Sequence, residues 1–298
     1  MNIALQVHVD TYRGTVEGIP PLLALFKEFN IQATFLFSLG PDNTGRALKR
    51  VFRPGFLSKV SRTSVVKHYG IRTLMYGVFL PGPDIAKKAG HIMRACKQDG
   101  HEVGIHCYDH VRWQDNVANK DAAWTAKELS KAENAFIKTF DEKPSTIGAA
   151  GWQVNQYTIA IEEKMGFQYA TDTRGKQPFF PKMGDIESSC LQIPTTLPTL
   201  DELIGQDELT EDNVADAVFK LSREALPYGH VYTLHAELEG LKLIGIFREL
   251  IEKWQKSGDK LISLQKMYQS LPLDKLPRKA IEMKEIEGRS GVLAMEGI

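Results

Sequence analysis

Two histidines four residues apart, His106 and His110, follow one apolar run, and Asp10 follows another at the start of the chain. Two imidazoles and one carboxylate are ligands that borderline divalent metals accept, and such a set leaves coordination positions open for water and substrate. A site of this kind is suited to hydrolysis. The spacing of the two histidines is weak evidence by itself, because surface or core histidines reach it by chance.

The elements that must position these residues alternate between strand and helix patterns. Strands are predicted at residues 3–9, 33–37, 102–106, 146–150, 167–171, 191–193, 230–234 and 260–264. Helices are predicted between them, at residues 20–29, 84–98, 121–140, 155–165, 211–226 and 241–255. This alternation predicts an α/β fold with a parallel sheet closed into a barrel.

Polar residues follow the last apolar residue of several of these strands. Besides the two histidines and Asp10, they are the Gly151-Trp152 turn, Asp172 and His235. The carboxyl ends of parallel strands are where α/β active sites form, so we expect these residues to meet at one edge of the sheet. This sorting favours a metal site over scattered histidines.

The composition is that of an ordinary protein with a core. Of 298 residues, 43% are apolar and 25% charged, which predicts one large α/β domain or two small ones. A net charge of zero argues against a general nucleic-acid binder. Three widely spaced cysteines indicate neither a disulfide framework nor a thiolate zinc site. We see no secretory leader and no apolar run of roughly 18 residues, and therefore expect a cytoplasmic protein.

The segment between Asp42 and Asp84 has no acidic residue but eight Lys and Arg residues among many apolar ones. This basic amphipathic insertion, residues 43–83, predicts a lid facing an anionic membrane, since aromatic side chains enter the lipid interface while cations meet the head groups. We assign membrane contact to Arg50, Phe52, Arg53, Phe56 and Lys59. A solvated lid packed on the barrel remains an alternative. We expect no nucleic-acid partner, because phosphate binding needs less apolar surface.

Several stretches of the sequence together resemble the polysaccharide deacetylase family. They are 8–15, 38–43, 102–106, 109–110, 149–152, 192–194, 196–199, 201–202, 204–205 and 233–237. Within the family they are similar to the bacterial branch that deformylates undecaprenyl phosphate-linked 4-deoxy-4-formamido-L-arabinose. The similarity covers nearly the whole chain, including the basic insertion and residues 288–291.

The resemblance implies a single catalytic domain over residues 1–298, built as a distorted (β/α)7 barrel. It implies a divalent metal (zinc, cobalt or manganese) on Asp10, His106 and His110, with His235 as the catalytic acid. The substrate would be a lipid-linked sugar at the cytoplasmic face of the inner membrane, in the aminoarabinose modification of lipid A that underlies polymyxin resistance. We assign substrate binding to Arg13, Trp152, Asp172, Arg174 and Glu237.

One position departs from the family pattern. The family has an Asp, its catalytic base, where this chain has His8. An imidazole can accept a proton near neutral pH, but it is bulkier and carries no negative charge. It could also become a fourth metal ligand and close the coordination sphere. We therefore expect this chain to have low activity or none. Gln153 is a lesser departure, since related sequences often carry Arg there.

Two other functions remain open from the sequence. The same site could deacetylate chitin or peptidoglycan, although that reaction needs export of the enzyme. Alternatively, His8 could have abolished the chemistry, so that the chain only binds lipid head groups.

Overall fold

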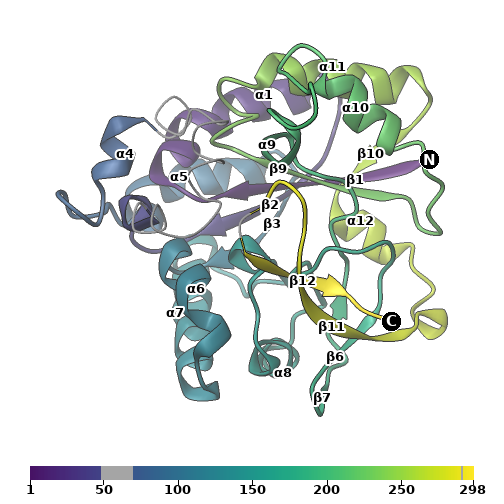
Figure 1. Ribbon diagram of the computed structural model, residues 1–298. Helices are drawn as coiled ribbons and strands as arrows, with labels where there is room; N and C mark the ends of the chain where they lie inside the picture. The colour runs from purple at the N-terminus through teal and green to yellow at the C-terminus, as the bar shows by residue number, and fades with distance from the viewer. Residues whose placement is uncertain (48–69, 290) are drawn as a thin grey trace.

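The computed structural model describes residues 1–47, 70–289 and 291–298 (Figure 1). Its centre is an eight-stranded sheet in which every neighbouring pair is parallel. Across the sheet the order is β9 (His230–His235), β1 (Asn2–Val9), β2 (Thr34–Ser38), β3 (Glu102–Cys107), β4 (Thr146–Ile147), β5 (Tyr169–Ala170) and β8 (Leu191–Gln192), while β10 (Lys260–Ile262) pairs with the beginning of β1.

The sheet curls until its two outer strands approach each other. The backbone N–H groups of Thr196 and Leu197, just after β8, both donate to the carbonyl oxygen of Val231 in β9, at 3.1 and 3.2 Å. Side chains continue the link, because the Thr195 and Thr233 hydroxyls lie 2.7 Å apart. The predicted distorted α/β barrel is therefore confirmed.

Helices cover the outside of this sheet (Figure 1). The longer ones are α1 (Ile19–Glu28), α5 (Ile85–Gln98), α7 (Ala122–Phe140), α8 (Gln156–Met165), α10 (Val214–Leu221) and α11 (Ile244–Lys256), and the shorter ones are α4 (Ile71–Met75), α6 (His110–Asn116), α9 (Leu200–Leu203) and α12 (Leu264–Gln269). In α5 the buried residues Ile85, Ala89, Met93 and Cys96 recur at helical spacing. Asp84 caps this helix by accepting from the Lys87 N–H at 3.1 Å.

Most predicted elements agree with the structure to within a few residues, and α10 is the main exception. It begins three residues later than predicted, after a turn that Thr210 and Asn213 close through a 2.8 Å bond from the Thr210 N–H to Asn213 Oδ1, and it ends five residues earlier, at Leu221. The π-helical turn Gly14–Gly18 directly precedes α1.

A second sheet, in the order β12-β11-β6-β7, was not predicted. It joins β6 (Phe180–Met183) and β7 (Ile186–Glu187) to the C-terminal hairpin of β11 (Arg278–Glu285) and β12 (Val292–Glu296). The hairpin is tied to Arg174, whose N–H donates to Ala294 O at 2.9 Å and whose carbonyl accepts from the Glu296 N–H at 2.7 Å. This sheet therefore brings the C-terminal segment to the barrel.

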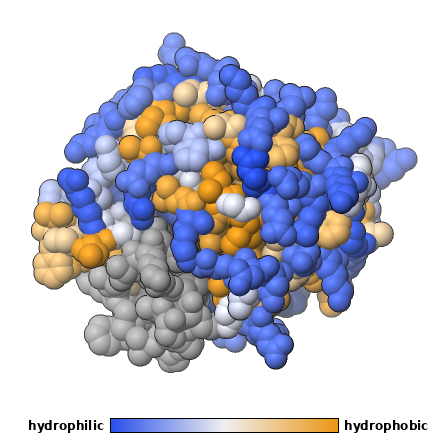
Figure 2. Space-filling view, turned by 90° about the horizontal axis from the view of Figure 1, so that it is seen from above, coloured by the Kyte–Doolittle hydropathy of each residue, from blue (hydrophilic) through white to orange (hydrophobic). Residues whose placement is uncertain are grey.

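The insertion is described only at its two ends. The residues assigned to membrane contact (Arg50, Phe52, Arg53, Phe56 and Lys59) lie outside the described part of the chain. At its second end, α4 and the loop after it expose large apolar side chains: Ile71 is 69% exposed, Val78 47% and Phe79 78%. Figure 2 shows hydrophobic residues gathered on this side of the molecule, beside the residues drawn in grey. Within the described ranges, none of the helices combines the length and the apolar character needed to cross a bilayer.

Candidate active site

The carboxylate of Asp10 lies between the imidazoles of His106 and His110. Asp10 follows β1, His106 is in β3, and His110 is the first residue of α6. Asp10 Oδ1 is 3.3 Å from His106 Nε2, and Oδ2 is 3.4 Å from His110 Nε2. Metal–donor distances of about 2.0–2.1 Å in a tetrahedral site separate the donors by roughly 3.3–3.4 Å. The two contacts are to different oxygens of Asp10, so each imidazole lies from the carboxylate at the separation that two donors of one metal ion would have.

Neighbouring groups hold the two histidines in this orientation. His106 Nδ1 lies 2.6 Å from the carbonyl oxygen of Gly148, so it donates there and directs Nε2 toward Asp10. His106 Nε2 is buried and has no hydrogen-bond partner among the described residues. Asp109 caps α6 by accepting from the Arg112 N–H at 3.0 Å, which sets the position of His110 on the first turn.

His8 adjoins this cluster. It precedes Asp10 by two residues, so both side chains lie on the same face of β1, and its ring centroid is 4.2 Å from that of His106. One ligand atom each of His8, Asp10 and His106 lie within 4.8 Å of one another. Burial, followed by the neighbouring His106 and His235 imidazoles, holds the pKa of His8 well below its ordinary value. A neutral imidazole here is able to bind a metal or to accept a proton.

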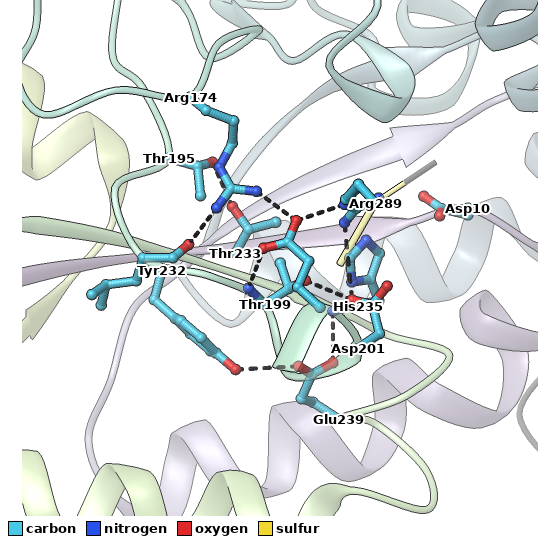
Figure 3. A network of polar contacts seen from close by, with 12 residues as sticks. Asp10, Arg174, Thr195, Thr199, Asp201, Tyr232, Thr233, His235, Glu239 and Arg289 are labelled. Carbon is cyan, nitrogen blue, oxygen red and sulfur yellow. Dashed lines mark hydrogen bonds and ion pairs between the residues drawn. The ribbon is translucent and has the colours of Figure 1, made fainter. Parts of the chain in front are cut away.

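His235 lies beside His8 at the end of β9. The two residues are register partners of the β1–β9 pair, and their ring centroids are 5.5 Å apart. The His235 N–H donates to Glu239 Oε2 at 2.9 Å, which fixes this strand end (Figure 3). Burial lowers the pKa of His235, while the carboxylates of Asp201 and Asp10 act in the opposite direction.

Two arginines, both labelled in Figure 3, form the next part of the site together with a tryptophan. Arg174 Nη1 and Arg289 Nε each lie 2.6 Å from the same oxygen, Glu202 Oε1. The Arg174 and Arg289 guanidinium carbons are 5.0 and 4.6 Å from the Trp152 ring centroid. Gly151 and Trp152 both have left-handed backbones, with φ of 65° and 53°, and this turn points the indole toward His8 at 5.4 Å.

Arg289 and Glu202 were given no role from the sequence. Arg289 lies on the turn between β11 and β12, a hairpin that no periodic pattern indicates. The stretches 201–202 and 288–291 were nevertheless among those that resemble the family, and this resemblance was the signal that could have assigned both residues to the site.

Three residues assigned to substrate binding have other contacts in the structure. Glu237 Oε1 accepts from the backbone N–H groups of Asp10 and Thr11 at 3.0 and 2.7 Å, and burial raises the pKa of Glu237 to about 8. Arg13 pairs with Glu17 at 2.8 Å on the surface. Asp172 is fully buried. Of the five assigned residues, Trp152 lies beside His8, and Arg174 reaches the site through its contact with Trp152.

Comparisons with known proteins agree on one family. The polysaccharide deacetylase family model matches residues 10–170. A Shewanella sediminis protein named "Probable 4-deoxy-4-formamido-L-arabinose-phosphoundecaprenol deformylase ArnD" is 37% identical over 98% of this chain and 93% of its own length. A Wigglesworthia glossinidia brevipalpis protein of the same name is 32% identical, over 95% of this chain and 98% of its own length. Among solved structures, a Mycobacterium smegmatis protein described as a polysaccharide deacetylase has a TM-score of 0.63 at 17% identity, covering 96% of this chain and 94% of the other.

Proposed function

The chain belongs to the polysaccharide deacetylase family, and from this we propose that it is an amide hydrolase that removes the formyl group from undecaprenyl phosphate-linked 4-deoxy-4-formamido-L-arabinose. The observation that supports the proposal is the position of the Asp10 carboxylate between the His106 and His110 imidazoles, in a chain whose relatives are named for this reaction. The role would be in the aminoarabinose modification of lipid A.

The residues of the site divide the chemistry among them. Asp10, His106 and His110 would hold a zinc, cobalt or manganese ion. When bound, such an ion acts as a Lewis acid and lowers the pKa of a water molecule. The side chain at position 8 accepts the proton of the water that attacks the formyl carbon. His235 donates a proton to the amine nitrogen as the C–N bond breaks, because an unprotonated nitrogen is a very poor leaving group. The products are formate and the free amino sugar.

A substrate comparison tests this proposal. The metal-loaded His8→Asp variant is incubated in turn with a short-chain polyprenyl phosphate formamidoarabinose and with an N-acetylglucosamine oligomer, and released formate and acetate are measured. We expect formate release to exceed acetate release by at least tenfold. Higher acetate release would assign the chain to the chitin or peptidoglycan deacetylases, and release of neither acid would leave only head-group binding.

We further propose that residues 1–298 act as one catalytic domain that docks on the cytoplasmic face of the inner membrane through the insertion. The exposed apolar side chains Ile71, Val78 and Phe79 support this, because they lie in the described second end of the cationic insertion and Phe79 is 78% exposed. Transferring an aromatic side chain from water into the lipid interface stabilises binding by about 1.5–3 kcal/mol, while the cations meet anionic head groups.

Substitution of Phe79 by Ser is expected to weaken membrane binding roughly tenfold, because it removes the largest exposed apolar side chain of the patch. The measurement is flotation with vesicles containing anionic lipid. Leu221→Ser is the matched control, since Leu221 is 45% exposed on α10, far from α4 in Figure 1. Equal binding by the wild type and Phe79→Ser would contradict docking through this loop.

A further inference from the structure

The carboxyl group of Asp172 is buried behind the histidine cluster, where substrate cannot reach it. Asp172 follows β5, and both of its oxygens accept hydrogen bonds, Oδ1 from the Ala149 N–H at 2.6 Å and Oδ2 from Gln192 Nε2 at 2.7 Å. The Asp172 N–H in turn donates to Gln192 Oε1 at 3.0 Å. Since Asp172 is fully buried, its contribution must pass through these neighbours.

One of these neighbours reaches a metal ligand. The Gly148 carbonyl and the Ala149 N–H belong to the same peptide group. Its carbonyl oxygen accepts from His106 Nδ1 at 2.6 Å, and its N–H donates to Asp172 Oδ1 at 2.6 Å. A carboxylate at the N–H end of an amide polarises it and makes the carbonyl oxygen a stronger acceptor. A stronger acceptor at Nδ1 makes Nε2 of the same ring a better ligand.

We infer that Asp172 is a positioning residue, which increases the metal affinity of His106 Nε2 by polarising the Gly148–Ala149 peptide group. The inference rests on the proposed function only in taking His106 as a ligand. It goes beyond that function by giving a role to a side chain that touches neither ion nor substrate.

A second buried carboxyl group keeps the charge on Asp172. Glu162, on α8, is fully buried, and its burial together with the Asp172 carboxylate raises the pKa of Glu162 well above its ordinary value. Burial also raises the pKa of Asp172, but the bonds from Gln192 and Ala149 act against this. Both oxygens of Asp172 accept hydrogen bonds from donors, whereas neither oxygen of Glu162 has such a partner among the described residues, so the negative charge is better stabilised on Asp172.

The test is the affinity of the purified chain for zinc, measured by competition with a chromophoric chelator. Asp172→Asn keeps an oxygen acceptor for Ala149 but removes the charge, and it is expected to weaken zinc binding roughly tenfold, the size of effect found for such outer partners. The His106 Nδ1 proton, observed by NMR in the zinc form, should move upfield as its hydrogen bond weakens.

Glu102→Gln is the matched control. Glu102 is a buried carboxylate on the same strand as His106, and it accepts from the Tyr169 hydroxyl at 2.7 Å and from the Gln265 N–H at 3.0 Å. Its substitution should leave zinc affinity within twofold of the wild type. If Asp172→Asn does not fold, the Asp172→Asn/Gln192→Glu variant is measured instead. In that variant the new amide at position 172 can donate to the new carboxylate at position 192, which reverses the original hydrogen bond.

Wild-type zinc affinity in the Asp172 variant, or an equal loss in Glu102→Gln, would overturn the inference. A tenfold loss in a protein that releases no formate would instead overturn the proposed function and leave the inference standing.

Discussion

Substitution of His8 by Asp is expected to raise the rate of formate release at least tenfold. A general base contributes roughly 10²- to 10⁴-fold to such reactions, and only part of this is available to the residue now in place. The His8 ring is buried with its centroid 4.2 Å from that of His106, so it fills the space beside the cluster without adding negative charge. An aspartate is smaller, and it places a proton acceptor of opposite charge next to the cation.

The measurement is kcat/KM for formate release, with metal content determined on the same samples. His8→Asn is the control, because it has the size of the aspartate without its charge and should gain little. Equal turnover in the wild type and His8→Asp would refute the assignment of position 8 as the base. If His8 also acts as a metal ligand, the Asp variant should bind zinc differently as well as turn over faster.

The alternating strands and helices could be predicted because their apolar residues recur at regular periods. The α5 face and the buried strands β1, beyond its first residue, and β3 are examples. The second sheet could not be predicted. Its strand β7 has only two residues, and β11 is mostly half-buried or exposed, so its sequence shows no clear alternation of apolar and polar residues. Its pairing of β6 with β11 also joins segments nearly a hundred residues apart.

The site could be predicted as far as it depends on the ends of strands. Asp10, His106 and His235 come together because parallel strands end at one edge of the sheet. The same rule placed Asp172 among the substrate contacts, but its side chain lies inside the barrel wall. Position after a strand therefore predicts proximity to the site, whereas the direction of the side chain depends on local twist. Arg289 arrives from the hairpin turn, for which this rule makes no prediction.

In the His8→Asp background, substitution of His235 by Ala is expected to lower kcat by roughly 10²- to 10⁴-fold. The residue adjoins the cluster as the register partner of position 8, but it is not one of the proposed ligands, which are Asp10, His106 and His110. Loss of His235 should therefore remove the proton for the departing amine and leave the metal content unchanged.

His230→Ala provides the matched control for this loss. His230 lies at the other end of β9, where Nδ1 is 3.0 Å from the Thr196 hydroxyl and Nε2 is 2.8 Å from the Glu224 carbonyl. Its removal disturbs the same strand without touching the cluster, so kcat should stay within a fewfold of the parent. A fall in metal content with His235→Ala would assign His235 to the ligands. Unchanged kcat and metal content would mean that another group donates the proton to the amine. Asp201, whose carboxylate acts on His235, would then be the first residue to substitute.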